Sequence, residues 1–311
     1  MNKSVLILVF IMALFACRER SRVNTDVLVA VSLEHGGRTR ECLVHVPARI
    51  PLSPAPLLIV LHGGGGTAKG VIQLTKSRFN ELSDSEGFYA AYPTGLGKSW
   101  NILGDNEFGY AGRNNIDDTG FVAALIERLA ASYAIDRNRI FATGISNGGF
   151  MSYRLACELS GTIRGIAAVA ATNPAGQKEH CRPIRPVSVM IINGTEDPIV
   201  PYDGGSVTIL GVKRGRILST DDTVAYWAAV DACPETRETR DLPDSDPEDG
   251  TRVTRTEIGP CGGARVVLIR ITGGGHTWPG GLHYLPTRFI GRTSHDINAC
   301  DEIWNFFSGL H

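Results

Sequence analysis

RIFATGISNGGFMSYRLAC, the run Arg139–Cys157, joins a strand-like apolar segment to a helix-like one through a glycine-rich bend. The bend carries the pattern G-x-S-x-G at residues 144–148, with Ser146 at its centre. A serine in such a strand-to-helix turn is held in a strained backbone conformation that exposes its hydroxyl. The helix that starts behind it offers free backbone N–H groups and a positive dipole end. We therefore predict that Ser146 is a nucleophile, although a chain with 36 glycines also produces this pattern by chance.

The partners that a nucleophilic serine needs also follow strand-like runs. Asp197 follows the apolar run 187–192, and His276 follows the apolar run 265–271. Serine, acid and histidine in this chain order, each after a strand, are typical of an α/β-hydrolase. Taken singly, Asp197 reads as a turn residue beside a proline and His276 as a loop histidine, but their joint placement favours a triad. Glu196 is the neighbouring alternative to Asp197, and we predict Asp197 as the acid.

A glycine run predicts the oxyanion hole. The apolar strand 56–61 leads into the sequence HGGGG at residues 62–66. Glycines at this place let a backbone N–H approach a ligand with no side chain in the way. We expect the N–H groups of Gly64 and Asn147 to receive the oxyanion, with the glycine on either side of Gly64 as the alternative. A flexible turn is the competing interpretation, and a phosphate loop is disfavoured because the pattern G-x-x-x-x-G-K-[ST] does not occur.

Strand-like and helix-like runs alternate along the chain. Strands are predicted near 27–33, 41–46, 56–61, 88–92, 139–145, 165–171, 187–192 and 266–271, and helices near 71–83, 119–133, 147–157, 220–232 and 296–307. This alternation predicts a mostly parallel, doubly wound sheet with helices on both faces, whose catalytic residues gather at the carboxyl ends of the strands. We predict one α/β-hydrolase domain, 27–311, with a small flap before Arg216 and no large lid between Asp197 and His276.

These motifs together resemble a known family. They are His62–Gly64, Gly144–Gly149, Asp197–Tyr202 and Gly275–Gly280, with further matches at Tyr92-Pro93, Ser99–Asn101 and Asp117–Phe121. The chain is similar over residues 27–310 to the secreted polyhydroxybutyrate depolymerases, an α/β-hydrolase family that includes feruloyl and acetylxylan esterases of the first carbohydrate-esterase group. The resemblance implies a serine esterase with Ser146, Asp197 and His276 as its triad and no cofactor. It leaves the acyl and alcohol groups open.

Two tryptophans are candidates for the walls of the substrate site. Trp278 lies two residues from His276, and Trp100 lies in one of the family-like motifs. Aromatic faces suit sugar rings, ferulate rings or the apolar face of a polyester, so fragments of plant polysaccharide or polyester are the expected partners. Packing in the core is the competing interpretation for both. Asp117 and Asp118 are most simply a helix cap and a dipole partner, and the resemblance implies that they lie near the site.

The first residues predict export. Lys3 precedes an apolar run that ends at Ala16, which is shorter than a membrane span and fits a secretory signal. The sequence LFAC at residues 14–17 looks like a bacterial lipoprotein processing box with Cys17 as the lipidated residue. We therefore expect a signal at 1–16, a polar tether at 17–26 and attachment to the outer membrane through lipid. Free secretion to the periplasm or medium and an uncleaved anchor are the alternatives.

Cysteine usage agrees with export. The chain has seven cysteines, and an even set of six remains apart from Cys17. Six cysteines in an exported chain suggest disulfides, and they allow 15 pairings. We expect Cys157–Cys181, for which the family shows a similar pair, Cys233–Cys261 across a polar excursion, and Cys42–Cys300 by elimination. Buried free thiols are the alternative, and the spacings do not favour a zinc site.

Composition excludes other classes of function. The 31 basic and 32 acidic residues give a net charge of −1, whereas a nucleic-acid-binding protein leaves a basic footprint. The acidic run 237–249 reads as a solvated loop rather than a metal site. We expect a monomer with no metal and no cofactor.

Three other functions compete with an esterase. A peptidase or an acyltransferase shares the fold, but a peptidase usually brings an extra gating domain. A surface-tethered lipoprotein that binds carbohydrate without catalysis is the third. The presence of all three residues Ser146, Asp197 and His276 argues against this non-catalytic function.

Overall fold

The computed structural model describes residues 28–102, 109–209 and 211–310. The predicted signal, the tether and Cys17 lie outside these residues. The strands are β1 Leu28–His35, β2 Arg38–His45, β3 Ala55–Leu61, β4 Tyr89–Pro93, β5 Ile135–Ile145, β6 Gly165–Val169, β7 Ser188–Gly194, β8 Gly205–Ile209, β9 Val212–Ile217, β10 Arg237–Asp241, β11 Arg252–Cys261 and β12 Ala264–Thr272. The helices are α2 Ala68–Leu74, α3 Arg78–Glu86, η1 Leu96–Lys98, α4 Tyr110–Arg113, α5 Asp118–Ala130, α6 Asn147–Glu158, α7 Gln177–His180, α8 Thr220–Val230, α9 Thr287–Ile290 and α10 Ala299–Ser308.

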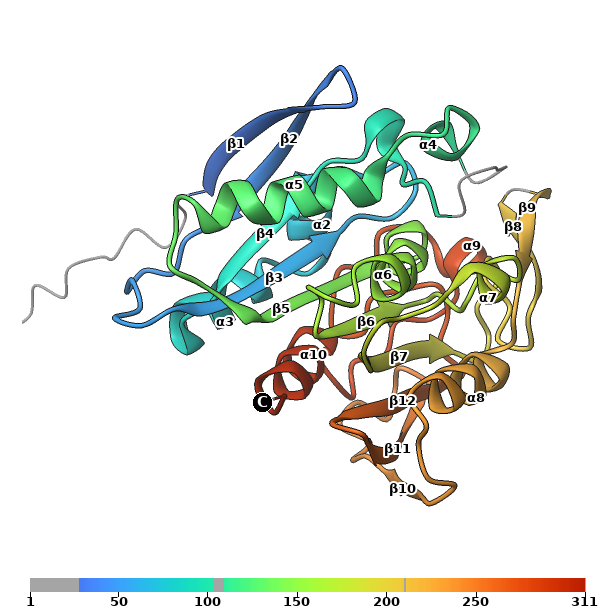
Figure 1. Ribbon diagram of the computed structural model, residues 1–311. Helices are drawn as coiled ribbons and strands as arrows, with labels where there is room; N and C mark the ends of the chain where they lie inside the picture. Colours follow the sequence, from blue (N-terminus) through green and yellow to red (C-terminus); the bar gives the residue numbers. More distant parts are fainter. Residues whose placement is uncertain (1–27, 103–108, 210, 311) are drawn as a thin grey trace, which may run out of the picture.

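Ten strands form one sheet in the order β1-β2-β4-β3-β5-β6-β7-β12-β11-β10 (Figure 1). The central strands from β4 to β12 pair in parallel, whereas both edges are antiparallel. The central strands β3 and β7 are buried along their whole length, as expected for parallel strands covered on both faces. This is the predicted α/β-hydrolase fold, with antiparallel edges that the sequence did not indicate.

The core is divided by the sheet into two layers. Successive residues of β3 alternate between them, since Leu57, Ile59 and Leu61 pack with α5, α6 and α8, while Leu58 and Val60 pack with α2, α3 and α10. Figure 1 shows the first group of helices lying across one face of the sheet. Because side chains alternate along a strand, both layers are built by the same apolar runs.

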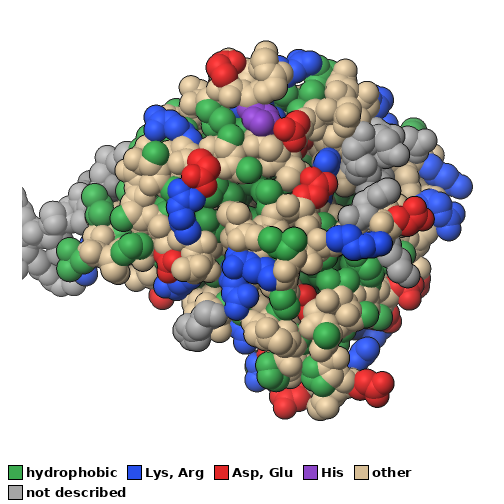
Figure 2. Space-filling view, viewed as in Figure 1, with side chains coloured by type: hydrophobic (Ala, Val, Ile, Leu, Met, Phe, Trp, Pro, Cys, Tyr) green, Lys and Arg blue, Asp and Glu red, His purple; other side chains and the backbone are tan. Residues whose placement is uncertain are grey.

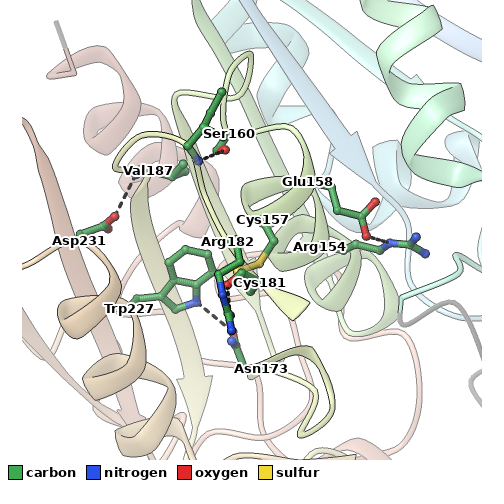
Figure 3. Close-up of a disulfide and its surroundings, with 11 residues drawn as sticks. Arg154, Cys157, Glu158, Ser160, Asn173, Cys181, Arg182, Val187, Trp227 and Asp231 are labelled. Carbon is green, nitrogen blue, oxygen red and sulfur yellow. Dashed lines mark hydrogen bonds and ion pairs between the residues drawn. A yellow bond between two sulfur atoms is a disulfide. The ribbon is translucent and has the colours of Figure 1, made fainter. Parts of the chain in front are cut away.

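Two disulfides have the predicted pairing. Cys157 on α6 is bonded to Cys181 just after α7 (Figure 3), and Cys233 is bonded to Cys261. The prediction of a Cys42–Cys300 disulfide is wrong, because both thiols are free and buried. Cys42 packs in the layer with α5 and α6, and Cys300 packs in the opposite layer. The sheet therefore lies between the two sulfurs.

Other differences arise where local backbone geometry overrides the apolar pattern. The helix predicted over 71–83 is two helices, α2 and α3, because Lys76 and Ser77 have positive φ values of 52° and 58°. The acidic run begins as strand β10, which pairs with β11 at the sheet edge. Among the described residues, no helix is long and apolar enough to cross a membrane.

Candidate active site

Ser146 lies in a sharp turn between β5 and α6. Its φ of 54° and ψ of −119° are strained values for a residue with a side chain. Its N–H donates to Val169 O at 2.9 Å and its carbonyl accepts from Phe150 N at 2.8 Å, so both ends of the turn are fixed. The Ser146 hydroxyl has no hydrogen-bond partner within the described ranges. The turn thus holds an uncommitted hydroxyl at the carboxyl end of the sheet.

Asp197 and His276 meet as predicted. Nδ1 of His276 lies 2.7 Å from Oδ2 of Asp197, and the two side chains are buried. The other oxygen, Oδ1, accepts N–H groups from Ile199 and Val200 at 2.8 Å each. The carboxylate is therefore held in place, where it can accept a proton carried on Nδ1, which would leave Nε2 free to accept another. Glu196, the alternative acid, is exposed and pairs with Arg292 instead.

The loops that carry this pair are tied to each other. Thr195 N–H donates to Ile271 O, and Glu196 N–H donates to Gly274 O, both at 2.9 Å. A Cβ at Gly194 would lie 2.2 Å from Gly274 O, so only glycine permits this approach. The Tyr284 hydroxyl donates to the His276 carbonyl at 2.9 Å, and burial raises the pKa of this phenol, which keeps its proton for that bond.

The glycine loop after β3 has backbone N–H groups that are not used within the loop. Gly65 N–H donates to Lys98 O at 2.7 Å and Gly66 N–H donates to Gly63 O at 3.0 Å, whereas neither Gly63 N–H nor Gly64 N–H has such a partner in the described part of the chain. A Cβ on Gly64 would lie 3.8 Å from Asn147 Cβ, which places this loop beside the start of α6. Gly64 and Asn147 therefore stand together beside Ser146, as an oxyanion hole requires.

The His62 ring connects the glycine loop to Gly95 through its two nitrogens. Its Nδ1 lies 2.8 Å from Gly63 O, and its Nε2 accepts the Gly95 N–H at 2.9 Å. Burial lowers the pKa of this imidazole, which favours the neutral form that can accept from Gly95. The sequence marks this histidine only as the residue before the glycines.

The tryptophans predicted as substrate walls are buried in the core. Trp100 and Trp278 are both 0% exposed, and neither is among the residues that line the hollows at Ser146. Trp100 donates its indole N–H to His62 O at 2.9 Å and stacks at 4.9 Å on the His62 ring. Trp278 packs edge-on against Phe79. The prediction is corrected accordingly, because the apolar rings pack inside the protein and Trp100 braces the glycine loop from behind.

Asp117 caps the helix as expected, whereas Asp118, the first residue of α5, also forms a buried ion pair that the sequence did not indicate. Asp117 caps α5 by accepting from Gly120 N–H at 2.9 Å. Asp118 is buried and bonds Arg40 at 2.6 Å and the Asn101 N–H at 2.7 Å. This buried pair fixes the segment that follows Trp100.

Ser146 and His276 line two adjoining hollows. The first, of about 340 Å³, is lined by the glycine loop, α2 and Leu282. The second, of about 480 Å³, extends toward η1, α4 and the β8–β9 hairpin, and we call it the cationic lobe because Lys98, Arg113 and Arg214 line it. Gly64, Gly65 and Tyr284 belong to both. The sequence did not single out these hollows, since their linings come from loops far apart in the chain.

Comparison with known proteins agrees with this geometry. The phospholipase/carboxylesterase family model matches residues 114–210. "Putative esterase NocK" of Nocardia uniformis subsp. tsuyamanensis is 31% identical over 94% of the chain and 86% of its own length. The chain belongs to the esterases of the α/β-hydrolase fold. It is a carboxylic ester hydrolase.

Further relatives are more distant or longer. Feruloyl esterase B of Piromyces equi is 28% identical over 71% of the chain, which spans 39% of that relative's length. The acetyl xylan esterase of Aspergillus awamori shares the fold, with a TM-score of 0.61, 17% identity, and coverage of 91% of this chain and 99% of that one. The two disulfides are typical of an exported esterase.

Proposed function

We propose that the chain hydrolyses esters through a triad of Ser146, His276 and Asp197. The observation that carries the proposal is the 2.7 Å contact between His276 Nδ1 and Asp197 beside a strained serine in the same hollow. Nε2 of His276 takes the Ser146 proton as Oγ attacks the ester carbonyl. The N–H groups of Gly64 and Asn147 receive the negative oxygen, each worth about 3–4 kcal/mol in the transition state.

The reaction ends with a second transfer to water. The alkoxide leaves with the proton that His276 holds, and the acyl group stays on Oγ as an ester. A water molecule then gives its proton to Nε2 and attacks the acyl carbonyl, which releases the acid and restores the Ser146 hydroxyl. Asp197 stabilises the positive imidazole in both halves of the reaction.

The test is the loss of turnover without loss of folding. We expect Ser146→Ala to abolish hydrolysis of p-nitrophenyl butyrate and labelling by a fluorophosphonate, with an unchanged melting temperature. Asn305→Ala, on the exposed face of α10 away from the site, serves as the control variant. Labelling of the Ser146→Ala protein at the wild-type rate would contradict the assignment, and an unlabelled wild type would favour a non-catalytic binding protein.

The natural ester is proposed to belong to the feruloyl, acetyl-xylan or polyhydroxybutyrate class. Sequence resemblance to these esterases and the names of two relatives support it. A panel of methyl ferulate, acetylated xylan and hydroxybutyrate oligomers separates the three by kcat/KM. Equal and low values on all three would contradict the proposal.

The anchor is proposed to be lipid on Cys17, on the basis of the LFAC sequence at residues 14–17. Metabolic labelling with an alkynyl fatty acid should tag the wild-type chain and leave Cys17→Ser untagged. A tag that survives this change, or none on the wild type, would contradict it.

A further inference from the structure

The cationic lobe contains three basic side chains and no acidic one among its described lining residues. Lys98, Arg113 and Arg214 line it. None of these three side chains forms an ion pair or a hydrogen bond within the described ranges. The chain has 32 acidic and 31 basic residues, and their charges are interspersed on the face drawn in Figure 2. Some arginines pair with carboxylates, as Arg40 does with Asp118, whereas the described lining of the lobe offers its cations no carboxylate.

Two of the basic residues lie on segments that are connected by hydrogen bonds to the glycine loop. Lys98 ends η1, and its carbonyl accepts the Gly65 N–H at 2.7 Å. Arg113 ends α4, whose Ala111 N–H donates to the Ser99 hydroxyl at 2.9 Å. These bonds connect both segments to the glycine loop.

Arg214 approaches from the other wall of the lobe. It lies on β9 of the hairpin, which stands at the right edge of the molecule in Figure 1. The hairpin is held to the body because Thr208 N–H donates to Ile199 O, two residues after Asp197, and Ala175 N–H donates to Arg216 O, both at 3.0 Å. The segments that carry all three basic residues are thus held by hydrogen bonds of the backbone, and the described residues supply no partner for the three charges.

Part of the lobe is apolar. Its lining includes Phe150, Ile199, Val207, Ile209, Leu285 and Ile290. An apolar floor with unpaired cations suits a ligand that has a hydrocarbon or aromatic body and a negatively charged end. A single carboxylate fits such a site, since guanidinium groups bind carboxylates through charge-assisted hydrogen bonds.

We propose that the cationic lobe binds a free carboxylate on the substrate, so that the enzyme prefers esters that also carry an unesterified carboxyl group. Arg113 and Arg214 are then specificity-determining residues. The inference rests on the proposed role of Ser146, because the lobe is defined by opening onto that hydroxyl. It adds a substrate class that the resemblance to other esterases does not supply.

Matched esters test the preference. Monoethyl adipate and ethyl adipamate carry the charge difference on the acyl side, while the acetate of gamma-hydroxybutyrate and its carboxamide carry it on the alcohol side. We expect kcat/KM to be about three- to tenfold higher for the carboxylate of at least one pair, and the ratio to shrink as salt screens the charges. The pair that responds tells which side of the ester enters the lobe.

Variants assign the effect to the lobe. Arg214→Gln and Arg113→Gln should each lower the carboxylate-to-carboxamide ratio, and the double variant should bring it close to one. Lys213→Gln is the matched control, because Lys213 is the exposed neighbour of Arg214 on β9 and does not line the lobe. A ratio near one in the wild type, or a ratio that Lys213→Gln lowers as much as Arg214→Gln, would overturn the proposal.

A binding measurement separates this proposal from the assignment of the nucleophile. Calorimetry on Ser146→Ala needs no turnover, and we expect the preferred carboxylate to bind about three- to tenfold more tightly than its carboxamide. Equal affinities would overturn the carboxylate site even if Ser146 is the nucleophile. Tighter carboxylate binding, lost in Ser146→Ala/Arg214→Gln, would support the site even if another residue attacks the ester.

Discussion

Asn147 holds the backbone of Trp100 from both sides. Its side-chain oxygen accepts the Trp100 N–H at 2.6 Å, and its side-chain nitrogen donates to Trp100 O at 3.2 Å. The residue after Ser146 therefore fixes, through its side chain, the segment whose indole donates to His62 O. Its main-chain N–H is the one proposed to receive the oxyanion.

We expect Asn147→Ala to weaken both stability and activity. The change leaves the buried N–H and carbonyl of Trp100 without partners, which costs roughly 1–3 kcal/mol for each unsatisfied group. Urea denaturation should report this loss, and kcat on p-nitrophenyl butyrate should fall because the glycine loop loses its brace.

Asn147→Asp is the matched control. It keeps the oxygen that accepts from Trp100 N–H and should retain more stability than Asn147→Ala. If both variants were as stable as the wild type, the two hydrogen bonds between the Asn147 side chain and the Trp100 backbone would not contribute to the free energy of unfolding.

The meeting of Asp197 with His276 was predictable because each follows a buried strand. Parallel strands bring their carboxyl ends to one edge of the sheet, so chain order and strand ends suffice to place loops together. Gly194 is a further indication in the sequence that these loops meet, since a glycine at the end of β7 allows the two loops to touch.

Three features could not be predicted because they depend on contacts between distant segments. An even number of cysteines says nothing about which side of the sheet each sulfur occupies, and Cys42 and Cys300 lie on opposite sides. A tryptophan near a motif can pack inward, as Trp100 does. The cationic lobe arises where η1, α4 and β9 converge, and no local pattern links these segments.

Asp231 makes the protein less stable as pH rises toward neutrality. Its carboxyl is 2% exposed, one oxygen accepts the Val187 N–H at 3.1 Å (Figure 3), and the other has no partner among the described residues. Burial raises the pKa of this carboxyl to about 7 from 3.8. The folded state thus binds the proton more tightly than the unfolded state does. The stability this contributes is complete below pH 3.8 and is lost as pH rises through about 7.

Asp231→Asn should remove this dependence. The amide resembles the protonated acid and keeps the oxygen that accepts from Val187. We expect the variant to exceed the wild type in unfolding free energy above neutral pH by on the order of 4 kcal/mol, and the two to converge as the pH falls toward 3.8. Parallel urea titrations across this pH range measure it. A wild type whose stability rises from mild acid to neutrality relative to the variant would refute the sign.

Gly148→Ala should disable the turn that carries Ser146. A Cβ at Gly148 would lie 2.4 Å from Leu61 O and 2.7 Å from His62 O, both rigid backbone atoms. The strand and helix would have to separate, and the serine and the glycine loop would part with them. We expect kcat/KM to fall at least about a hundredfold, since small displacements of reacting groups are costly.

Gly64→Ala is the comparison, because its Cβ meets only Asn147 Cβ at an ordinary 3.8 Å and its N–H is retained. It should fold like the wild type and keep most of its activity on p-nitrophenyl acetate. Equal losses in the two variants would mean that the glycines serve flexibility in general rather than the close approach at Gly148.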